Sequence, residues 1–290
     1  MGCRALPLLH NWRWDNYQQD LRFGVGYHLN QASKRLHSID VGDSLWAFTR
    51  RPDDGAYVLV AELVARAKTI NHPSFRYGRH RLWGDLASSR YFLADGQPRI
   101  DHVIRSLTLD VQAKYIGQAF QGKAAVRTII AEDHAKLAAV AAQLPREPRA
   151  RLIPEECFEA LALAGDHDEV KRLLAADGPG LAAERQSYLY SPAVSRARSW
   201  TRELRDRYED RCQLCGWSSL GSYQEEVCEA HHMHWRSRGG PDKLHNLVLL
   251  CPNHHRVVHR TDAVFDYQDL AFVFTERHRE PLQEAGHLAS

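Results

Sequence analysis

Apolar residues dominate two segments near the start of the chain, and their pattern predicts a pair of β-strands. The segments GDSLWAFTR (42–50) and AYVLVAELVARA (56–67) are rich in β-branched and aromatic residues, which favour extended backbone. Between them lies RPDDG (51–55), whose Asp54-Gly55 pair is a typical hairpin turn. We therefore expect these two segments to pair as antiparallel strands.

Helical patterns follow in the middle of the chain. An alanine-rich stretch predicts a helix over 133–144, which two prolines then end. Two shorter helices are expected at 155–164 and 168–176, and a charged helix at 195–208. Nearer the end, the segment EAHH reads as a strand and the segment HHRVVH as a helix.

These elements fall into three parts and indicate an α+β fold. The strand-rich part predicts an N-terminal domain over residues 1–130, the helices predict a connector over 131–194, and the remainder predicts a C-terminal domain over 195–275. With 290 residues, of which 44% are hydrophobic, the chain is long enough for each domain to bury a core without disulfides.

The distribution of apolar residues excludes a membrane span. No run of eighteen or more apolar residues occurs, and the apolar stretch at the N-terminus is too short for a signal peptide. The expected location is therefore the cytoplasm. Four of the six cysteines fall within forty residues, and in a cytoplasmic chain such clustering favours metal ligands over disulfides.

The small net charge of +2 conceals separate basic and acidic blocks. Residues 1–127 have a net charge of +7, residues 128–194 of −4, and residues 195–260 of +3. Two basic blocks suit a polyanion such as DNA that is held at both ends. An ordinary solvated surface explains the same totals.

Two pairs of residues with metal-ligand spacing predict a structural zinc site. Cys212 and Cys215 form a Cys-x-x-Cys hook, followed by a glycine that permits its tight turn. Cys251 and His254 repeat the spacing further on. Together the four residues make a plausible closed Cys₃His site, although the first pair also has a reading as plain reduced thiols.

The remaining histidines of this region are spaced in a way that predicts a second metal site. His255 and His259 lie four residues apart in the expected helix and so share one face. His231 and His232 are adjacent in the expected strand, where successive side chains point in opposite directions. One of them is therefore able to bind a metal while its neighbour stays free to act as a base.

These residues give the span 212–259 its resemblance to the HNH, or ββα-metal, endonuclease module. The matching pieces are CQLCG, EAHHMHW and RGGPDKLHNLVLLCPNHHRVVH, and the three name-giving positions fall on His232, Asn246 and His255. The chain departs from the commoner zinc-ribbon version at His254, where that version has cysteine. The resemblance implies a DNA endonuclease whose substrate is double-stranded DNA.

The resemblance also implies roles for single residues. His232 corresponds to the general base, Asn246 to the residue that orients its ring and pins the loop, and His231, His255 and His259 to the ligands of one divalent metal. That metal is Mg²⁺, Mn²⁺, Ni²⁺ or Zn²⁺, and the expected products are 5′-phosphate and 3′-hydroxyl ends.

Further residues near the motif have less definite assignments. Arg236, Arg238 and Arg256 are near enough in sequence to bind flanking phosphates, although each alone also suits ordinary surface. His234 and His245 have no assigned role, with His234 placed on the strand face of His232. The residues Cys228 and Glu229 are alternative ligands.

The first 130 residues are expected to target or restrain the nuclease, because a single-metal cleft reads phosphates and not bases. Arginines accompany aromatic residues there, a composition that suits a flipped base in a cage. The arginines are Arg76, Arg79 and Arg81, and the cage candidates are Trp12, Trp14, Tyr27 and Trp46. A small barrel core with exposed arginines is the competing interpretation.

The pattern VGDSLWAFTR…GAYVLVAELVA resembles the PUA-like group of mixed β-barrels, which includes EVE and SRA modified-base readers. Beside an HNH module it is similar to modification-dependent restriction endonucleases, which cut DNA that carries 5-methylcytosine or 5-hydroxymethylcytosine. A double-strand break needs two HNH centres or two events, which favours a homodimer. The alternatives are an HNH endonuclease specific for an unmodified sequence, and a zinc-ribbon nucleic-acid-binding protein without catalysis.

Overall fold

The computed structural model describes residues 6–22, 26–75, 77–153, 155–161, 167–175, 177, 179–189, 197–241 and 243–288. The chain divides into two compact units. One comprises residues 1–21 and 27–151, and the other comprises residues 22–26 and 152–290. The expected boundary at 130 therefore lies inside the first unit. The reason is that Leu137 and Ala141, beyond that boundary, are buried in the core of this unit.

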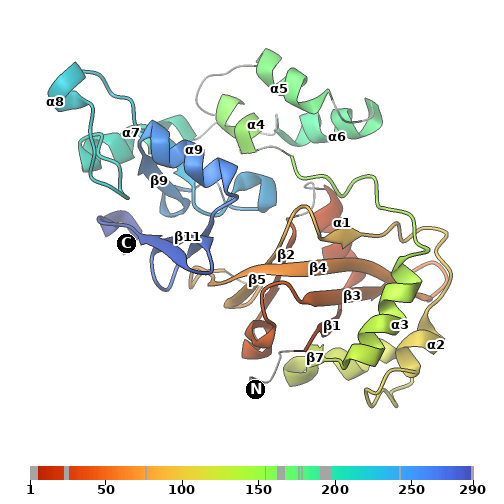
Figure 1. Cartoon of the computed structure of the whole chain (residues 1–290). Helices are drawn as coiled ribbons and strands as arrows, with labels where there is room; N and C mark the ends of the chain where they lie inside the picture. The colour runs from red at the N-terminus through yellow and green to blue at the C-terminus, as the bar shows by residue number, and fades with distance from the viewer. Residues whose placement is uncertain are drawn as a thin grey trace. The chain divides into compact units, whose positions relative to one another are not determined.

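A mixed sheet forms the framework of the first unit (Figure 1). Along the sheet its strands lie in the order β2-β5-β4-β3-β1-β7, and β6 pairs with β4. The strands are β1 (Leu8–Asn11), β2 (His28–Gln31), β3 (Ser44–Arg50), β4 (Tyr57–Ile70), β5 (His80–Gly84), β6 (Arg90–Tyr91) and β7 (Val126–Thr128). Its helices are α1 (Trp14–Arg22), α2 (Asp101–Arg105) and α3 (Ala131–Ala141).

The expected hairpin is confirmed. Strand β3 pairs with β4 in antiparallel register from Ser44 opposite Val64 to Arg50 opposite Tyr57, and Gly55 in the turn has a positive φ of 69°. The pair β1–β3 is parallel, whereas the other pairs of this sheet are antiparallel, so the sheet is mixed.

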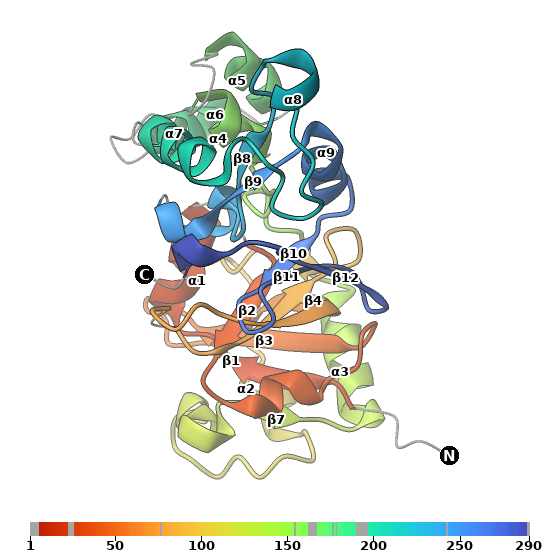
Figure 2. The ribbon, with the colours of Figure 1, turned by 90° about the vertical axis from the view of Figure 1, so that its left-hand side faces the viewer.

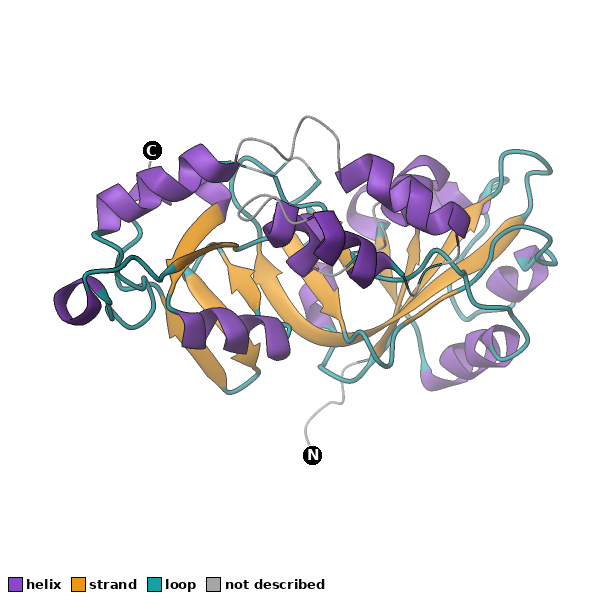
Figure 3. Cartoon of the chain, turned by 90° about the horizontal axis from the view of Figure 1, so that it is seen from above, coloured by secondary structure: helices purple, strands orange, loops and turns teal. Residues whose placement is uncertain are grey.

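The sheet is curled but open. Figure 3 shows the strong curvature of its strands, and among the described strands β2 and β7 stand at the two ends of the order without pairing to each other. These end strands have only 4 and 3 residues. In place of the expected mixed β-barrel, the described part of the chain has a half-barrel.

Helices and small sheets alternate in the second unit. Its helices are α4 (Glu155–Glu159), α5 (His167–Leu174), α6 (Pro179–Leu189), α7 (Ala197–Tyr208), α8 (Leu220–Tyr223) and α9 (Pro252–Arg260). Strands β8 (Glu229–His232) and β9 (Leu247–Leu250) form a hairpin, and β10 (Val264–Asp266), β11 (Ala271–Thr275) and β12 (His278–Pro281) form a three-stranded sheet. The expected helices at 155–164, 168–176 and 195–208 are confirmed in position by α4, α5 and α7, and residues 162–164, 176 and 195–196 of these ranges lie outside the described residues.

Two separate cores hold this unit together. The larger core joins α7, the β8–β9 hairpin, α9 and β11 around Leu249, Val258 and Phe272, and Figure 2 shows α9 beside β8 and β9. The smaller core joins α4, α5 and α6 around Phe158 and Val170. The expected boundary between connector and nuclease domain, at 194, lies outside the described residues.

The second unit extends beyond the expected end at residue 275. His287 is buried, shares a 2.6 Å hydrogen bond with the Tyr208 hydroxyl and lies 2.8 Å from the Leu247 carbonyl oxygen. These contacts attach the C-terminal segment to α7 and β9. None of the helices in the described residues combines the length and the apolar character that a bilayer crossing requires.

Candidate metal centres and active site

The cysteine hook and the start of α9 meet in a Cys₃His group. Cys212, Cys215, Cys251 and His254 place one ligand atom each within 4.8 Å of one another. His254 Nδ1 lies 3.3 Å from the sulfur of Cys251 and 3.6 Å from that of Cys212, and the sulfurs of Cys215 and Cys251 are 3.9 Å apart. Zinc with Zn–S bonds of about 2.3 Å requires tetrahedral edges of roughly this length, so the group fits the ion.

Local contacts prepare this group for a metal. Gly216 has a φ of 72° and its N–H donates to the Cys212 carbonyl at 2.8 Å, which closes the tight turn of the hook. Nε2 of His254 lies 3.2 Å from Glu280, and a carboxylate behind a ligating imidazole fixes the orientation of the ring. Burial raises the pKa of Cys251 to about 12, and metal binding removes that proton.

Cys228 does not belong to the group. Its thiol is fully buried and donates to the Asp210 carbonyl at 3.2 Å. Burial raises its pKa to about 12. Cys228 is therefore a core residue, and the alternative assignment as a ligand does not agree with its position.

A second group contains the three expected histidines and one carboxylate. His231, His255, His259 and Glu159 place one ligand atom each within 4.8 Å of one another. His255 and His259 share one face of α9, and His231 reaches the same point from β8. Glu159 comes from the last turn of α4. The sequence reasoning missed it because 72 residues separate it from His231.

Four of the six distances between the ligand atoms of the second group match the edges of a tetrahedral site. Oε1 of Glu159 lies 3.2 Å from His231 Nδ1 and 3.1 Å from Nε2 of both His255 and His259, and the last two atoms are 3.3 Å apart. A tetrahedron with such edges has its centre about 2.0 Å from each corner, which equals the bond length of zinc to nitrogen or oxygen. Nε2 of His231 is also buried without a hydrogen-bond partner in the described residues.

The four side chains of the second group differ in how burial and hydrogen bonding shift their pKa values. Burial alone would raise the pKa of Glu159, but hydrogen bonds with the three histidines outweigh it and hold this pKa well below its usual range. Burial lowers the pKa of His231 to about 4. In His255 burial is outweighed by Glu159 and Glu229, which raise the pKa to about 10. The group therefore holds an anion beside a protonated imidazole, and a divalent cation would replace that proton.

Glu229 supports the second group from behind and is not one of its four members. Its Oε2 lies 2.6 Å from Nδ1 of His255, while Nε2 of the same ring faces Glu159. Glu229 is the first residue of β8, two positions before His231, so the two side chains share one face of the strand. It therefore orients a candidate ligand in the way that carboxylates behind metal-binding histidines do.

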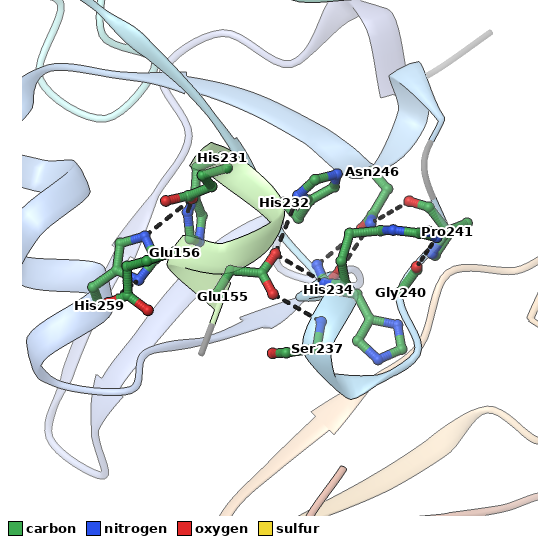
Figure 4. A network of polar contacts seen from close by, with 12 residues as sticks. Glu155, Glu156, His231, His232, His234, Ser237, Gly240, Pro241, Asn246 and His259 are labelled. Atoms are coloured by element: carbon green, nitrogen blue, oxygen red, sulfur yellow. Dashed lines mark hydrogen bonds and ion pairs between the residues drawn. The ribbon is translucent and has the colours of Figure 1, made fainter. Parts of the chain in front are cut away.

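His232 points away from the second group, as the strand alternation predicts, and faces Glu155 (Figure 4). Nδ1 of His232 lies 3.2 Å from Oε1 of Glu155, and both side chains are almost fully buried. The Glu155 carboxylate also accepts hydrogen bonds from the backbone N–H groups of Arg236 at 2.9 Å and Ser237 at 2.8 Å. Sequence reasoning missed Glu155 as well, since nothing distinguishes it from a solvated acidic residue.

Asn246 cross-links the loop that follows β8. Its Oδ1 accepts from the His234 N–H at 2.8 Å and from the Tyr267 hydroxyl at 2.7 Å. Its Nδ2 donates to the carbonyl oxygens of His234 and Pro241, both at 2.8 Å (Figure 4). At Gly240 the His234 backbone leaves no room for a Cβ. The loop is therefore fixed on both sides of His234.

The three arginines expected near the site have different surroundings. Arg236 and Arg238 are buried. The guanidinium of Arg236 donates to the Gly240 carbonyl at 3.1 Å, and that of Arg238 pairs with Asp262 and stacks over the Trp235 ring. Arg256 is exposed on α9. The first two therefore hold the loop together, and Arg256 is the arginine of this set that faces solvent.

The arginines of the first unit also differ. Arg81 is 2% exposed, donates to Asn30 Oδ1 at 2.6 Å and lies over the rings of Phe75 and Trp83. Its guanidinium is occupied inside the unit. Arg79 is exposed, and Arg76 lies outside the described residues.

Three of the four residues expected to form an aromatic cage belong to one aromatic cluster, and the fourth, Trp46, does not. Trp12 and Tyr27 both contact the Tyr91 ring, and Trp14 reaches the same cluster through Tyr17. Trp46 is fully buried in the core that contains Phe92, the strand neighbour of Tyr91, and its indole donates to His134 at 3.0 Å. Neighbours in a strand point to opposite faces, so Trp46 lies on the other face of the sheet.

Comparisons with known proteins agree with this geometry in the second unit. Residues 212–261 match the family described as HNH endonuclease, a span that includes seven of the eight residues in the two metal groups. Among curated proteins none matches the chain. The chain therefore contains a region, residues 212–261, that matches the HNH endonuclease domain.

One similar solved structure is described as that of the Type IV phosphorothioation-dependent restriction endonuclease ScoMcrA. The two chains have 19% sequence identity and a TM-score of 0.20. The match covers 75% of the present chain and 42% of the other, so it spans less than half the length of that protein.

Proposed function

We propose that this protein is a restriction endonuclease that cuts double-stranded DNA at its HNH centre and reads a modified cytosine with its first unit. The observation that carries the nuclease part is the arrangement around β8. Consecutive residues of this strand, His231 and His232, face a tetrahedral metal-binding group on one side and a buried acidic partner on the other. Metal-assisted hydrolysis needs a bound metal ion and a general base next to each other, and His231 and His232 would supply these two functions.

His232 is the general base in this proposal. Its neutral imidazole takes a proton from the water that attacks the phosphorus, and the bond from phosphorus to the 3′-oxygen breaks. This step leaves 5′-phosphate and 3′-hydroxyl ends. Asn246 positions the loop that follows His232, because it ties both sides of His234 to Pro241 and Tyr267.

His231, His255 and His259 hold the working ion, with Glu159 as the fourth member of the group in this conformation. The ion supplies stabilisation of the negative charge on the departing oxygen. Three imidazoles suit Zn²⁺, Ni²⁺ or Mn²⁺, and Mg²⁺ is the further candidate. Cys212, Cys215, Cys251 and His254 hold a structural Zn²⁺ that joins the hook to the start of α9.

Arg256 binds a phosphate of the DNA beside the HNH centre in this proposal. It is exposed on α9, next to the proposed ligand His255. Arg236 and Arg238 act through the loop that they hold in place. Among Arg76, Arg79 and Arg81, Arg79 is the one that is both described and exposed, and it is the candidate for DNA contact in the first unit.

The modified-base reader is the finer part of the proposal. It is supported by the aromatic cluster around Tyr91, in which Trp14 and Tyr27 are partly exposed and so able to receive a base. Tyr27 has a φ of 50°, a backbone strain that functional positions often store. Trp46 is withdrawn as a cage residue because it is a core residue. The PUA-like assignment of this unit stays a prediction.

The test uses matched plasmids that differ only in modification: unmodified, 5-methylcytosine, 5-hydroxymethylcytosine and phosphorothioate DNA. We expect cleavage of the two cytosine-modified plasmids in the presence of a divalent metal. Equal cutting of all four plasmids would contradict the proposed recognition of modified cytosine, and the proposed nuclease activity would stand. Discrete fragments from unmodified DNA would point instead to recognition of a sequence. Sedimentation with and without DNA tests the expected homodimer.

A further inference from the structure

Helix α4 brings two carboxylates to the two halves of the HNH centre. Glu155 and Glu159 are one helical turn apart and share a face of the helix. Glu155 meets His232, the proposed base, and Glu159 meets the three proposed metal ligands. Neither residue lies in the span that matches the HNH family. An element from outside the nuclease motif therefore contacts every proposed catalytic imidazole.

Glu155 lies in a cradle built for an anion. Two backbone N–H groups, those of Arg236 and Ser237, donate to its two oxygens at 2.9 and 2.8 Å, and His232 lies 3.2 Å away. Consecutive backbone N–H groups that point at one spot form a typical site for phosphate. A phosphate group of DNA offers oxygen acceptors like those of this carboxylate.

Glu159 takes the position that a catalytic metal site must leave open. With this carboxylate the second group has four protein ligands in tetrahedral spacing. Four protein ligands are typical of structural sites, whereas catalytic sites keep one position for water or substrate. The three histidines alone would leave that position to a phosphate oxygen.

The reactive groups are also shielded from solvent. Relative to free side chains, those of His231 and His232 are 0% and 6% exposed, and those of His255 and His259 are 15% and 10% exposed. A scissile phosphate must come within hydrogen-bond distance of the base. A DNA duplex is too wide to reach imidazoles that are this deeply buried. Helix α4, whose Glu155 and Glu159 contact them, is the element whose displacement would open the path in this proposal.

The packing of α4 allows such a movement. Its apolar residues Cys157 and Phe158 belong to the small core of α4, α5 and α6. The core of the HNH module contains no residue of these three helices among the described ones. Separation of two independent cores costs less than unfolding either of them. The small core is thus able to carry the two carboxylates away while the nuclease core stays intact.

We propose that α4 is a built-in competitor of the DNA backbone, whose Glu155 and Glu159 carboxylates occupy the phosphate positions of the HNH centre and keep the enzyme inactive until DNA displaces the helix. The inference rests on the proposed nuclease function. It assigns the restraint on cleavage to the connector between the first unit and the HNH motif.

The first experiment compares cleavage rates of the full-length protein. We expect the double variant E155Q/E159Q to cut a plasmid at least about tenfold faster than the wild type in kcat/KM, because two amides compete less well than two carboxylates for the metal and the cradle. E169Q on α5 makes the same change at a partly exposed residue of the same helical group, which pairs with Arg172 and not with the HNH centre, and it should leave the rate unchanged. E159Q alone should give part of the increase if the double variant folds poorly.

The second experiment has a readout independent of cleavage. Zinc-loaded protein without other divalent ions is mixed with a 20-base-pair duplex, and amide hydrogen exchange is followed in residues 155–161. We expect faster exchange in this segment when DNA is bound, and tighter DNA binding by the double variant in fluorescence anisotropy. Slower or unchanged exchange, or a lower cleavage rate in the variants, would overturn the proposal and make Glu159 a required ligand.

The two proposals fail in different ways. If neither the wild type nor any variant cuts any DNA with any metal, the nuclease function is wrong. If the wild type cuts and E155Q/E159Q cuts no faster, only the competitor role of α4 is wrong. H232A in the double-variant background should abolish the increased cleavage, which ties that activity to this centre.

Discussion

His254 and His255 are neighbours in the chain and belong to two different metal-binding groups. Nδ1 of His254 lies 3.3 Å from the sulfur of Cys251, and Nε2 of His255 lies 3.1 Å from Glu159. The helical rotation of about 100° between successive residues turns the two rings apart. One turn of α9 therefore joins the structural and the working site, and the separation of the two sites leads to distinct predictions for each.

The structural site is tested by serine at Cys215. We expect C215S to lose its tightly bound zinc and to unfold with a free energy several kcal/mol lower, because structural zinc contributes directly to folding. C228A is the matched control. It removes a thiol outside the group and should keep the zinc content of the wild type. Zinc content by mass spectrometry and urea unfolding measure these two effects. A zinc content equal to that of the wild type in C215S would exclude the assignment.

The proposed base is tested by alanine at His232. We expect H232A to lose cleavage by a factor of about 10² to 10⁴, the usual contribution of a positioned base. DNA binding and both metals should remain, because His232 belongs to neither group. Single-turnover cleavage and anisotropy measure the two properties. Unchanged cleavage would transfer the base role to another residue.

Glu229 provides a test of the working site that leaves its ligands intact. We expect E229Q to need about 10- to 100-fold more divalent metal for half-maximal cleavage, since the carboxylate behind His255 is lost. The maximal rate at saturating metal should stay close to that of the wild type. A metal titration of the cleavage rate separates the two quantities, and an unchanged midpoint would show that Glu229 does not support the site.

His10 predicts a pH dependence of stability in the first unit. Burial lowers its pKa from 6.5 to about 4, while its Nδ1 donates to the Ala125 carbonyl at 2.7 Å. The unfolded state therefore binds the proton more tightly between these two values. The contribution of neutral His10 to the free energy of unfolding is fully present above about pH 6.5. It is lost as the pH falls to about 4, and the total loss is about 3 kcal/mol.

The variant H10Q isolates this effect. We expect its deficit in unfolding free energy relative to the wild type to shrink between pH 7 and pH 4.5, because only the wild type loses the contribution of a neutral buried imidazole. Urea unfolding of both proteins at a series of pH values measures the difference. A deficit that stays constant over this range would mean that His10 does not titrate with a lowered pKa.

Trp46 and Trp14 are expected to respond differently to alanine. W46A should lose about 3 to 5 kcal/mol of unfolding free energy, because a fully buried indole leaves a cavity and an unsatisfied His134. W14A, at a partly exposed position of α1, should lose about 1 kcal/mol or less. If the reader proposal is correct, W14A instead weakens the preference for modified plasmids. Urea unfolding and plasmid cleavage measure the two effects.

The sequence by itself determined the elements and ligands whose information is local. The Cys-x-x-Cys and Cys-x-x-His spacings predicted the first group, the four-residue spacing of His255 and His259 predicted a shared helix face, and strand alternation separated His231 from His232. The β3–β4 hairpin was predicted in the same way, from residues that are adjacent or joined by a short turn.

Tertiary structure alone decided what distant segments bring together. Glu155 and Glu159 reach the HNH centre from 72 to 100 residues away in sequence, and an acidic pair in a short helix has no local pattern that separates a ligand from a solvated charge. In the same way, tryptophans of the first unit that look equivalent in the sequence differ in how deeply they are buried. Trp46 became core and Trp14 stayed near the surface, because burial depends on which face of the folded sheet each residue meets.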